Sequence, residues 1–165
     1  MNFLKTWIQA AIAAIQFLTR LPIPVQIEYS HRTVPQSTVF FPAAGLIVGV
    51  AASIAAWLGL MFLPSPAAAV FSLLTWTLAS GGLHLDGWMD TADGVFSHRS
   101  RERMLEIMKD SRVGAMGVLA AIFILMMKWS LLWSLFNLTT ATLFVLCLIP
   151  VWSRWMMVWA IRCWP

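Results

Sequence analysis

Three aspartates lie within eight positions near the middle of the chain: Asp86, Asp90 and Asp93. The chain has only seven acidic residues, and six of them fall between Asp86 and Asp110. In a helix, the spacing i, i+4, i+7 would place the three carboxylates on one face, within about 60° of arc. Because like charges at this spacing repel each other and are costly beside a membrane, we expect a divalent cation to offset them.

The ligand types indicate which cation this would be. The cluster offers hard carboxylate oxygens, no cysteine and a single nearby histidine, His84, and this set suits Mg²⁺ or Mn²⁺ better than Zn²⁺. We therefore predict a Mg²⁺ site. His84 would lie about 160° around an ideal helix from Asp86, so joint ligation requires one of the neighbouring glycines to break the helix. A solvated acidic turn at a helix end is the alternative interpretation.

Basic residues follow the aspartates along the chain. Lys109 and Arg112 come where the chain returns to an apolar stretch, and Arg154 lies inside a later apolar segment. Carboxylates and cations gathered at a membrane boundary are typical of phosphoryl transfer, in which metal ions bridge a pyrophosphate and cations take the charge on phosphate oxygens. Arg154 is therefore a candidate for a phosphate contact. Snorkelling of its side chain to an interface is the alternative.

The composition excludes an ordinary soluble domain. Of the 165 residues, 60% are hydrophobic and 11% are charged, and the mean hydropathy is +0.79, so we predict an integral membrane protein in contact with the lipid bilayer. No Asp, Glu, Lys or Arg occurs between Arg32 and Asp86, a length sufficient for two spans. The net charge of +4 does not indicate a nucleic-acid partner, because the basic residues sit between apolar runs rather than on one face.

The apolar pattern predicts an all-α, polytopic membrane bundle that forms one domain over residues 1–165. The expected membrane segments are approximately residues 3–18, 38–63, 67–85, 114–136 and 139–161. The first is short, so it crosses the bilayer, lies re-entrant or rests at the interface. Residues 86–113 form the water-facing active-site loop, with a short amphipathic helix that has Ser100 as its N-cap and i,i+3 ion pairs such as Glu106 with Lys109.

Small residues predict where the segments pack. Gly45 and Gly49 form a G-x-x-x-G pair that lets another helix approach closely, and Gly114 and Gly117 offer a similar face. Lys128 lies far along its segment, and we expect it to snorkel to the far interface.

The basic residues also predict an orientation. Residues 86–113 hold five Lys and Arg, so this loop should face the cytoplasm, and the connector from residue 20 to 32 then falls on the same side. So do Arg154 and Arg162, whereas the uncharged turn at Pro64 falls outside. We expect an inner-membrane protein with its acidic site on the cytoplasmic side.

Several runs of sequence carry a likeness to a known family. They are GGLHLDG at 81–87, DTADG at 90–94 and RERMLEIMKDSRVG at 101–114, with weaker support from FLTRLP at 17–22, FP at 41–42 with Gly45, and SRW at 153–155. On these runs the chain resembles the cobalamin-5'-phosphate synthase family, also called adenosylcobinamide-GDP ribazoletransferases.

The resemblance implies a Mg²⁺-dependent reaction. A ribose hydroxyl of α-ribazole, or of α-ribazole 5'-phosphate, attacks the cobinamide-side phosphate of adenosylcobinamide-GDP, and GMP leaves. It implies catalytic and metal-binding roles for Asp86, Asp90 and Asp93, a metal-binding role for Asp110, and substrate or phosphate binding by His84, Lys109, Arg112 and Arg154. Which aspartate is the base stays open. The expected partners include further copies of the chain, in a homo-oligomer, or other cobalamin-assembly enzymes.

The resemblance also implies a longer chain with further membrane segments after Arg154, so this chain is expected to be a C-terminally short member. Three other readings stay open. A CDP-alcohol phosphotransferase making phospholipid would predict a D-x-x-D-G-x-x-A-R order, which the residues after Asp86 do not supply. A cation transporter or channel would spread its carboxylates through the depth of the spans. A structural partner in a corrinoid-assembly complex is the third.

Overall fold

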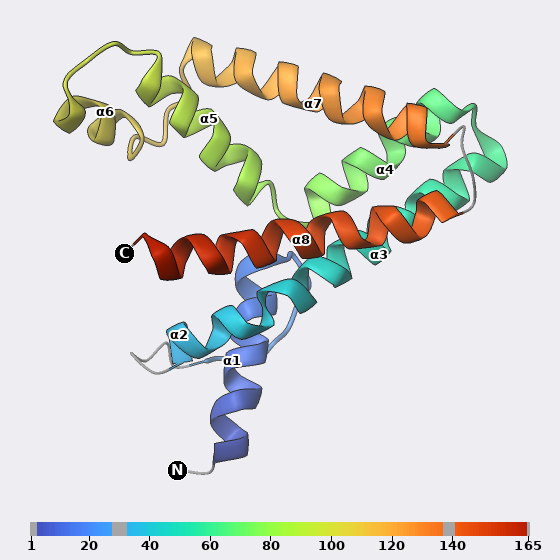
Figure 1. The fold of residues 1–165 in the computed structure, drawn as a ribbon, viewed down its shortest axis with the longest axis horizontal. Helices are drawn as coiled ribbons and strands as arrows, with labels where there is room; N and C mark the ends of the chain where they lie inside the picture. Colours follow the sequence, from blue (N-terminus) through green and yellow to red (C-terminus); the bar gives the residue numbers. More distant parts are fainter. Residues whose placement is uncertain (1–2, 28–32, 137–140, 165) are drawn as a thin grey trace.

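The fold is built from helices alone in the part of the chain that the structure describes (Figure 1). This computed structural model describes residues 3–27, 33–136 and 141–164. The elements in chain order are α1 (Phe3–Leu18), α2 (Thr33–Ser37), the 3-10 turn η1 (Thr38–Phe40), α3 (Phe41–Phe62), α4 (Ser65–Ala79), α5 (Leu83–Val95), α6 (Arg101–Ile107), α7 (Ala115–Phe136) and α8 (Ala141–Cys163). The predicted all-α class is confirmed.

Three helical stretches in the described residues are long and apolar enough to cross a membrane. They are Thr33–Phe62, Ala115–Phe136 and Ala141–Cys163, and α4 with α5 counts as a fourth if this bent pair is one span. The polytopic character is therefore confirmed by length and composition. Helix α1, with 16 residues, is shorter than the roughly 20 residues of a usual span.

The long N-terminal stretch begins earlier than the sequence predicted. Its described helical residues start at Thr33 instead of residue 38, and two hydroxyl side chains make hydrogen bonds within these first turns. Ser37 Oγ donates to the carbonyl of Val34 at 2.7 Å, and Thr38 Oγ1 donates to the carbonyl of Pro35 at 2.8 Å. The connector residues 28–32 and the start of the predicted 139–161 segment lie outside the described residues.

The predicted span 67–85 is not one helix. Helix α4 ends at Ala79, and α5 leaves it at an angle of 87°. Gly81 and Gly82 both adopt positive φ, 66° and 71°, a backbone region that L side chains rarely reach. The amide of Gly82 donates to the carbonyl of Thr77 and that of Gly81 to Leu78, each at 3.0 Å, which is the pattern of a Schellman helix end. Asp86 and its neighbours therefore sit on a separate helix.

Helices α3 and α8 lie side by side through the middle of the molecule (Figure 1). The predicted role of the G-x-x-x-G pair is confirmed. A Cβ added at Gly45 would come within 2.5 Å of the Pro150 carbonyl oxygen, and one at Gly49 would collide with the carbonyl of Cys147. Ser53 adds a hydrogen bond across the same contact, from Oγ to the carbonyl of Leu143 at 3.0 Å. The two backbones are thus in direct contact.

Replacing Gly49 by alanine should lower the stability of the bundle. The new methyl group would push α3 and α8 apart, and overpacking of this kind costs about 1–3 kcal/mol. Gly87→Ala is the matched control, because a Cβ at that helical position meets nothing within 4 Å and should be neutral or stabilising. Thermal unfolding in detergent would compare them. Equal melting temperatures for the two variants would contradict the close contact.

Candidate functional site

Helix α5 carries the three clustered aspartates, so their i, i+4, i+7 spacing does place them on one face. The helix begins where the left-handed turn at Gly82 ends, and Asp86 lies in its first turn, where a negative charge interacts favourably with the helix dipole. The side chain of Asp86 is exposed, and those of Asp90 and Asp93 are half-buried. The three residues differ in what they contact.

The Asp93 carboxylate is held by the beginning of α7. One carboxylate oxygen accepts a hydrogen bond from the amide of Gly114 and the other from the amide of Gly117, each at 2.7 Å. These amides belong to the first turn of a helix, where backbone donors have no partner within the helix. Asp93 therefore caps α7 from outside and offsets its positive end.

This contact explains the small residues at the start of α7. A Cβ at Gly114 or Gly117 would collide with the Asp93 carboxylate. The sequence predicted a close helix–helix approach at this face, and α5 does pack against α7 there. The approaching group is the aspartate side chain itself, which the spacing of small residues does not reveal.

The carboxylates of Asp86 and Asp90 make no hydrogen bond or ion pair within the described part of the chain. Asp86 opens onto a cavity of about 450 Å³ that is also lined by Arg20, Gly81, Gly82 and Met89. Arg20 reaches this place because its amide donates to the carbonyl at the end of α4, at 2.8 Å. From its sequence position, Arg20 was expected in the cytoplasmic connector and had no predicted role at the site. The structure brings its charge beside the acidic face.

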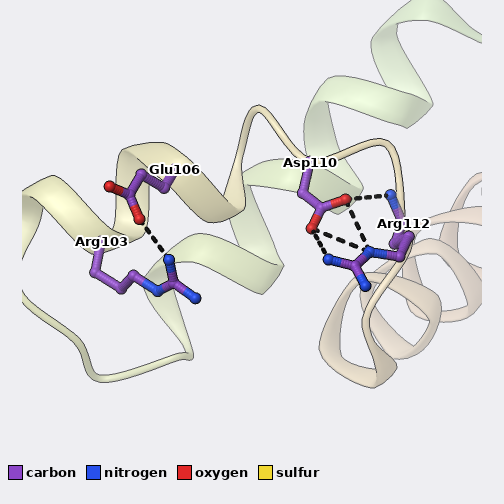
Figure 2. A network of polar contacts seen from close by, with 4 residues as sticks. All are labelled: Arg103, Glu106, Asp110 and Arg112. Atoms are coloured by element: carbon purple, nitrogen blue, oxygen red, sulfur yellow. Dashed lines mark hydrogen bonds and ion pairs between the residues drawn. The ribbon is translucent and has the colours of Figure 1, made fainter.

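The remaining predicted residues of this region lie in and around α6, and Figure 2 shows two of their ion pairs, Arg103 with Glu106 and Arg112 with Asp110. Ser100 is the predicted N-cap of α6, with Oγ accepting from the amide of Arg103. Glu106 pairs with Arg103 at 2.5 Å and not with Lys109 as predicted, because i,i+3 neighbours on either side compete for one carboxylate. Lys109 itself is exposed.

Asp110 and Arg112, which the sequence assigned to metal and phosphate binding, face each other (Figure 2). The Arg112 guanidinium donates to both Asp110 oxygens, with Nη2 to Oδ2 at 2.7 Å and Nε to Oδ1 at 3.1 Å. Hydrogen bonds from the side chain and the amide of Arg112 lower the pKa of Asp110 to about 2. The two charges thus neutralise each other in this structure.

A second cavity, of about 70 Å³, lies on the other side of the break between α4 and α5. His84, Lys128 and Arg154 all line it. Arg154 is only 2% exposed, so its side chain does not snorkel to an interface. The half-buried Lys128 side chain has its ammonium 5.4 Å from the ring centroid of Trp76, and its snorkelling to the far interface stays a prediction.

The donors around Asp86 fit Mg²⁺. Among the described residues, no three His, Cys, Asp or Glu side chains converge as metal ligands, and the carboxylates of Asp93 and Asp110 have partners of their own. Mg²⁺, however, usually binds one or two carboxylates and fills its shell with waters and substrate phosphates. Asp86 and Asp90, one helical turn apart and without protein partners, supply such a pair.

Comparison of the sequence with known proteins identifies its family. The model of the family described as cobalamin-5-phosphate synthase matches residues 10–165. The chain belongs to this family. The match covers α1 from its middle onward and includes both cavities and the acidic face of α5, so the family resemblance noted in the sequence is confirmed.

Several curated relatives carry the name adenosylcobinamide-GDP ribazoletransferase. The protein from Brevibacillus brevis is 40% identical over 94% of this chain and 62% of its own length. The one from Desulfitobacterium hafniense is 40% identical over 98% of this chain and 62% of its own length, and that from Herpetosiphon aurantiacus is 43% identical over 86% and 56%. The chain thus spans about three fifths of the length of these relatives. No solved structure matches it.

Replacing Asp93 by asparagine should destabilise the fold. The variant loses a charged acceptor for two backbone amides, worth about 1–3 kcal/mol. The matched control is Asp86→Asn, which removes an exposed carboxylate without protein partners and should change stability by less than about 0.5 kcal/mol. Thermal unfolding, with hydrogen exchange at the Gly114 and Gly117 amides, would test this. Unchanged exchange in Asp93→Asn would contradict the capping role.

The Asp110 carboxyl should titrate near pH 2 and not near its ordinary value of about 3.9. Because its pKa is lower in the folded than in the unfolded chain, the stability it adds is complete above about pH 4 and is lost as the pH falls toward 2. Carbon-13 NMR of the carboxyl group would follow the titration. In Arg112→Gln the pKa should return to the ordinary range, and the same pKa in both proteins would contradict the ion pair.

Proposed function

We propose that this chain carries the active site of an adenosylcobinamide-GDP ribazoletransferase. The reaction would join α-ribazole, or its 5'-phosphate, to adenosylcobinamide-GDP and release GMP. The family match over most of the chain and the shared name of its relatives support this proposal. The proposal concerns the whole protein's activity, of which this chain spans a part.

One observation carries the chemical argument. The turn at Gly81 and Gly82 separates two cavities that share Gly82 and Leu85 as walls. One cavity presents the Asp86 carboxylate and Arg20, and the other presents buried cations. A site for displacement at a diphosphate needs both kinds of group, acidic ones for a proton and a metal, and basic ones for phosphate oxygens.

The residues of the acidic side suit proton transfer. The attacking ribose hydroxyl loses its proton as its oxygen bonds to the cobinamide-side phosphorus, and the bond to the GMP oxygen breaks. Asp86 or Asp90 would accept that proton, because neither carboxylate is engaged with another described residue. Arg20 would bind phosphate oxygens beside them. A Mg²⁺ ion held by Asp86 and Asp90 would supply Lewis-acid stabilisation of phosphate charge.

The position of the site relative to the membrane is part of the proposal. We place the protein in the cytoplasmic inner membrane, with the segment after α5 facing the cytoplasm, where nucleotides are available. The five basic residues between residues 86 and 113 support this orientation. The proposed protein partners are a second copy of the chain or other enzymes of cobalamin assembly.

The structure does not favour a cation transporter or channel. All three clustered carboxylates lie on a single helix of 13 residues, and Asp93 is engaged with the start of α7. A conduction path would need carboxylates or carbonyls at several depths. A CDP-alcohol phosphotransferase that makes phospholipid is not favoured either, because the residues after Asp86 do not supply its D-x-x-D-G-x-x-A-R order.

Release of GMP tests the proposal directly. Purified protein in liposomes, given adenosylcobinamide-GDP and α-ribazole 5'-phosphate, should release GMP with Mg²⁺ and not with EDTA. Asp86→Asn and Asp90→Asn should each lower the rate by about 100-fold or more, since each removes a candidate base and metal ligand.

The control for this assay is Glu102→Gln, because Glu102 is an exposed residue of α6 that the proposed site does not use. Its rate should equal that of the unmodified protein. Absence of GMP release from folded protein, or equal rates in both aspartate variants and the control, would overturn the proposal.

A further inference from the structure

The smaller cavity, behind the turn between α4 and α5, is surrounded by groups that bind anions. Its volume of about 70 Å³ exceeds the roughly 10–15 Å³ that one water needs, so a group the size of a phosphate can enter it. Three helices each contribute one basic side chain to its wall: His84, Lys128 and Arg154. None of its lining residues, which all lie in the described part of the chain, is acidic.

Arg154 is the strongest indication of a ligand. The residue is 2% exposed, and its Nε and Nη2 atoms are buried without a hydrogen-bond partner among the described residues. A guanidinium keeps its charge in a protein interior. Burying such a charge without a partner is costly, so the arrangement calls for an anion that the described part of the chain does not supply.

Lys128 and His84 add to the same cavity. The ammonium of the half-buried Lys128 lies 5.4 Å from the ring centroid of Trp76, and this cation–π contact favours its position at the cavity wall. Both ring nitrogens of His84 are buried and have no partner among the described residues. Each side chain therefore has a donor available for a ligand.

The beginning of α5 contributes further donors. Gly82, His84 and Leu85 line the cavity, and no side chain caps the start of this helix. The first amides of a helix have no partner within it and carry partial positive charge. Helix starts of this kind bind phosphate groups in many proteins.

We propose that this cavity is an oxyanion site that takes one phosphate group of a diphosphate-containing substrate. The existence of the anion site stands on the contacts alone, and its assignment to a substrate rests on the proposed function. This cavity borders that of Asp86, because Gly82 and Leu85 line both. The cations around a phosphate held beside Arg154 would offset the charge that develops when its bond to the second phosphate breaks.

Pyrophosphate binding tests the site without catalysis. The full chain in dodecyl maltoside micelles, which contain no phosphate, would be titrated with radiolabelled inorganic pyrophosphate in EDTA by equilibrium dialysis. Arg154→Met and Lys128→Met should each weaken binding at least about tenfold, since each removes a charged donor. Arg162→Met is the matched control, because Arg162 lies on the same helix and is exposed. Equal affinity in Arg154→Met and the control would overturn the inference.

Melting temperatures separate ligand binding from a structural role. Because the unpartnered cation destabilises the ligand-free protein, Arg154→Met should melt at the same or a higher temperature while it loses pyrophosphate binding. Pyrophosphate should raise the melting temperature of the unmodified protein and not that of the variant. A lower melting temperature with retained pyrophosphate binding would make Arg154 a structural residue and overturn the site.

Competition identifies the source of the phosphate. GMP should displace pyrophosphate if the cavity serves a soluble substrate, whereas displacement only by added phosphatidylglycerol would assign the site to a lipid headgroup and overturn the substrate assignment. The two proposals also fail separately. Pyrophosphate binding without GMP release would support the anion site and contradict the proposed reaction. Full GMP release by Arg154→Met would support the reaction and contradict the role of the site in it.

Discussion

The left-handed turn at Gly81 and Gly82 is the constraint on which the arrangement of the site depends. Without it α4 would continue, and the aspartates would extend along the same axis as the membrane segment before them. With it, α5 turns by 87° and lies against α7, where Asp93 can reach the first amides of that helix. The same turn places the uncapped start of α5 between the two cavities. Only a residue without a side chain adopts this backbone at low cost.

Some charged side chains near this turn have a partner of opposite charge or a helix start, and others have none. Asp93 is offset by the start of a helix, and Asp110 by Arg112. Asp86, Asp90 and Arg154 have no such partner in the described residues. A protein interior normally pairs its charges because unpaired ones cost free energy, and this cost applies to the buried Arg154. Asp86 is exposed and Asp90 half-buried, so their carboxylates stay available to a ligand from solvent.

The sequence alone predicted those features that depend on local spacing. The apolar runs indicated the helices, the G-x-x-x-G pair indicated a close contact of α3 with an unspecified helix, and the i, i+4, i+7 spacing indicated the acidic face. It could not predict that Asp93 caps a helix beginning more than twenty residues later, or that Lys128 and Arg154 share a cavity. These contacts depend on how whole helices are placed. The pairing of Glu106 with Arg103 instead of Lys109 depends on where α6 ends, because Lys109 lies beyond its last residue, Ile107.

The contact between α3 and α8 has a consequence for biosynthesis. Ser53 and its partner carbonyl at Leu143 are separated by 90 residues, so α3 enters the membrane long before the ribosome has made the helix that covers its glycines. Until then its small-residue face is open to lipid and to any other helix with a similar face. Correct assembly therefore requires the intervening helices to insert without occupying that face. A slowly translated or stalled chain would spend longest in this vulnerable state.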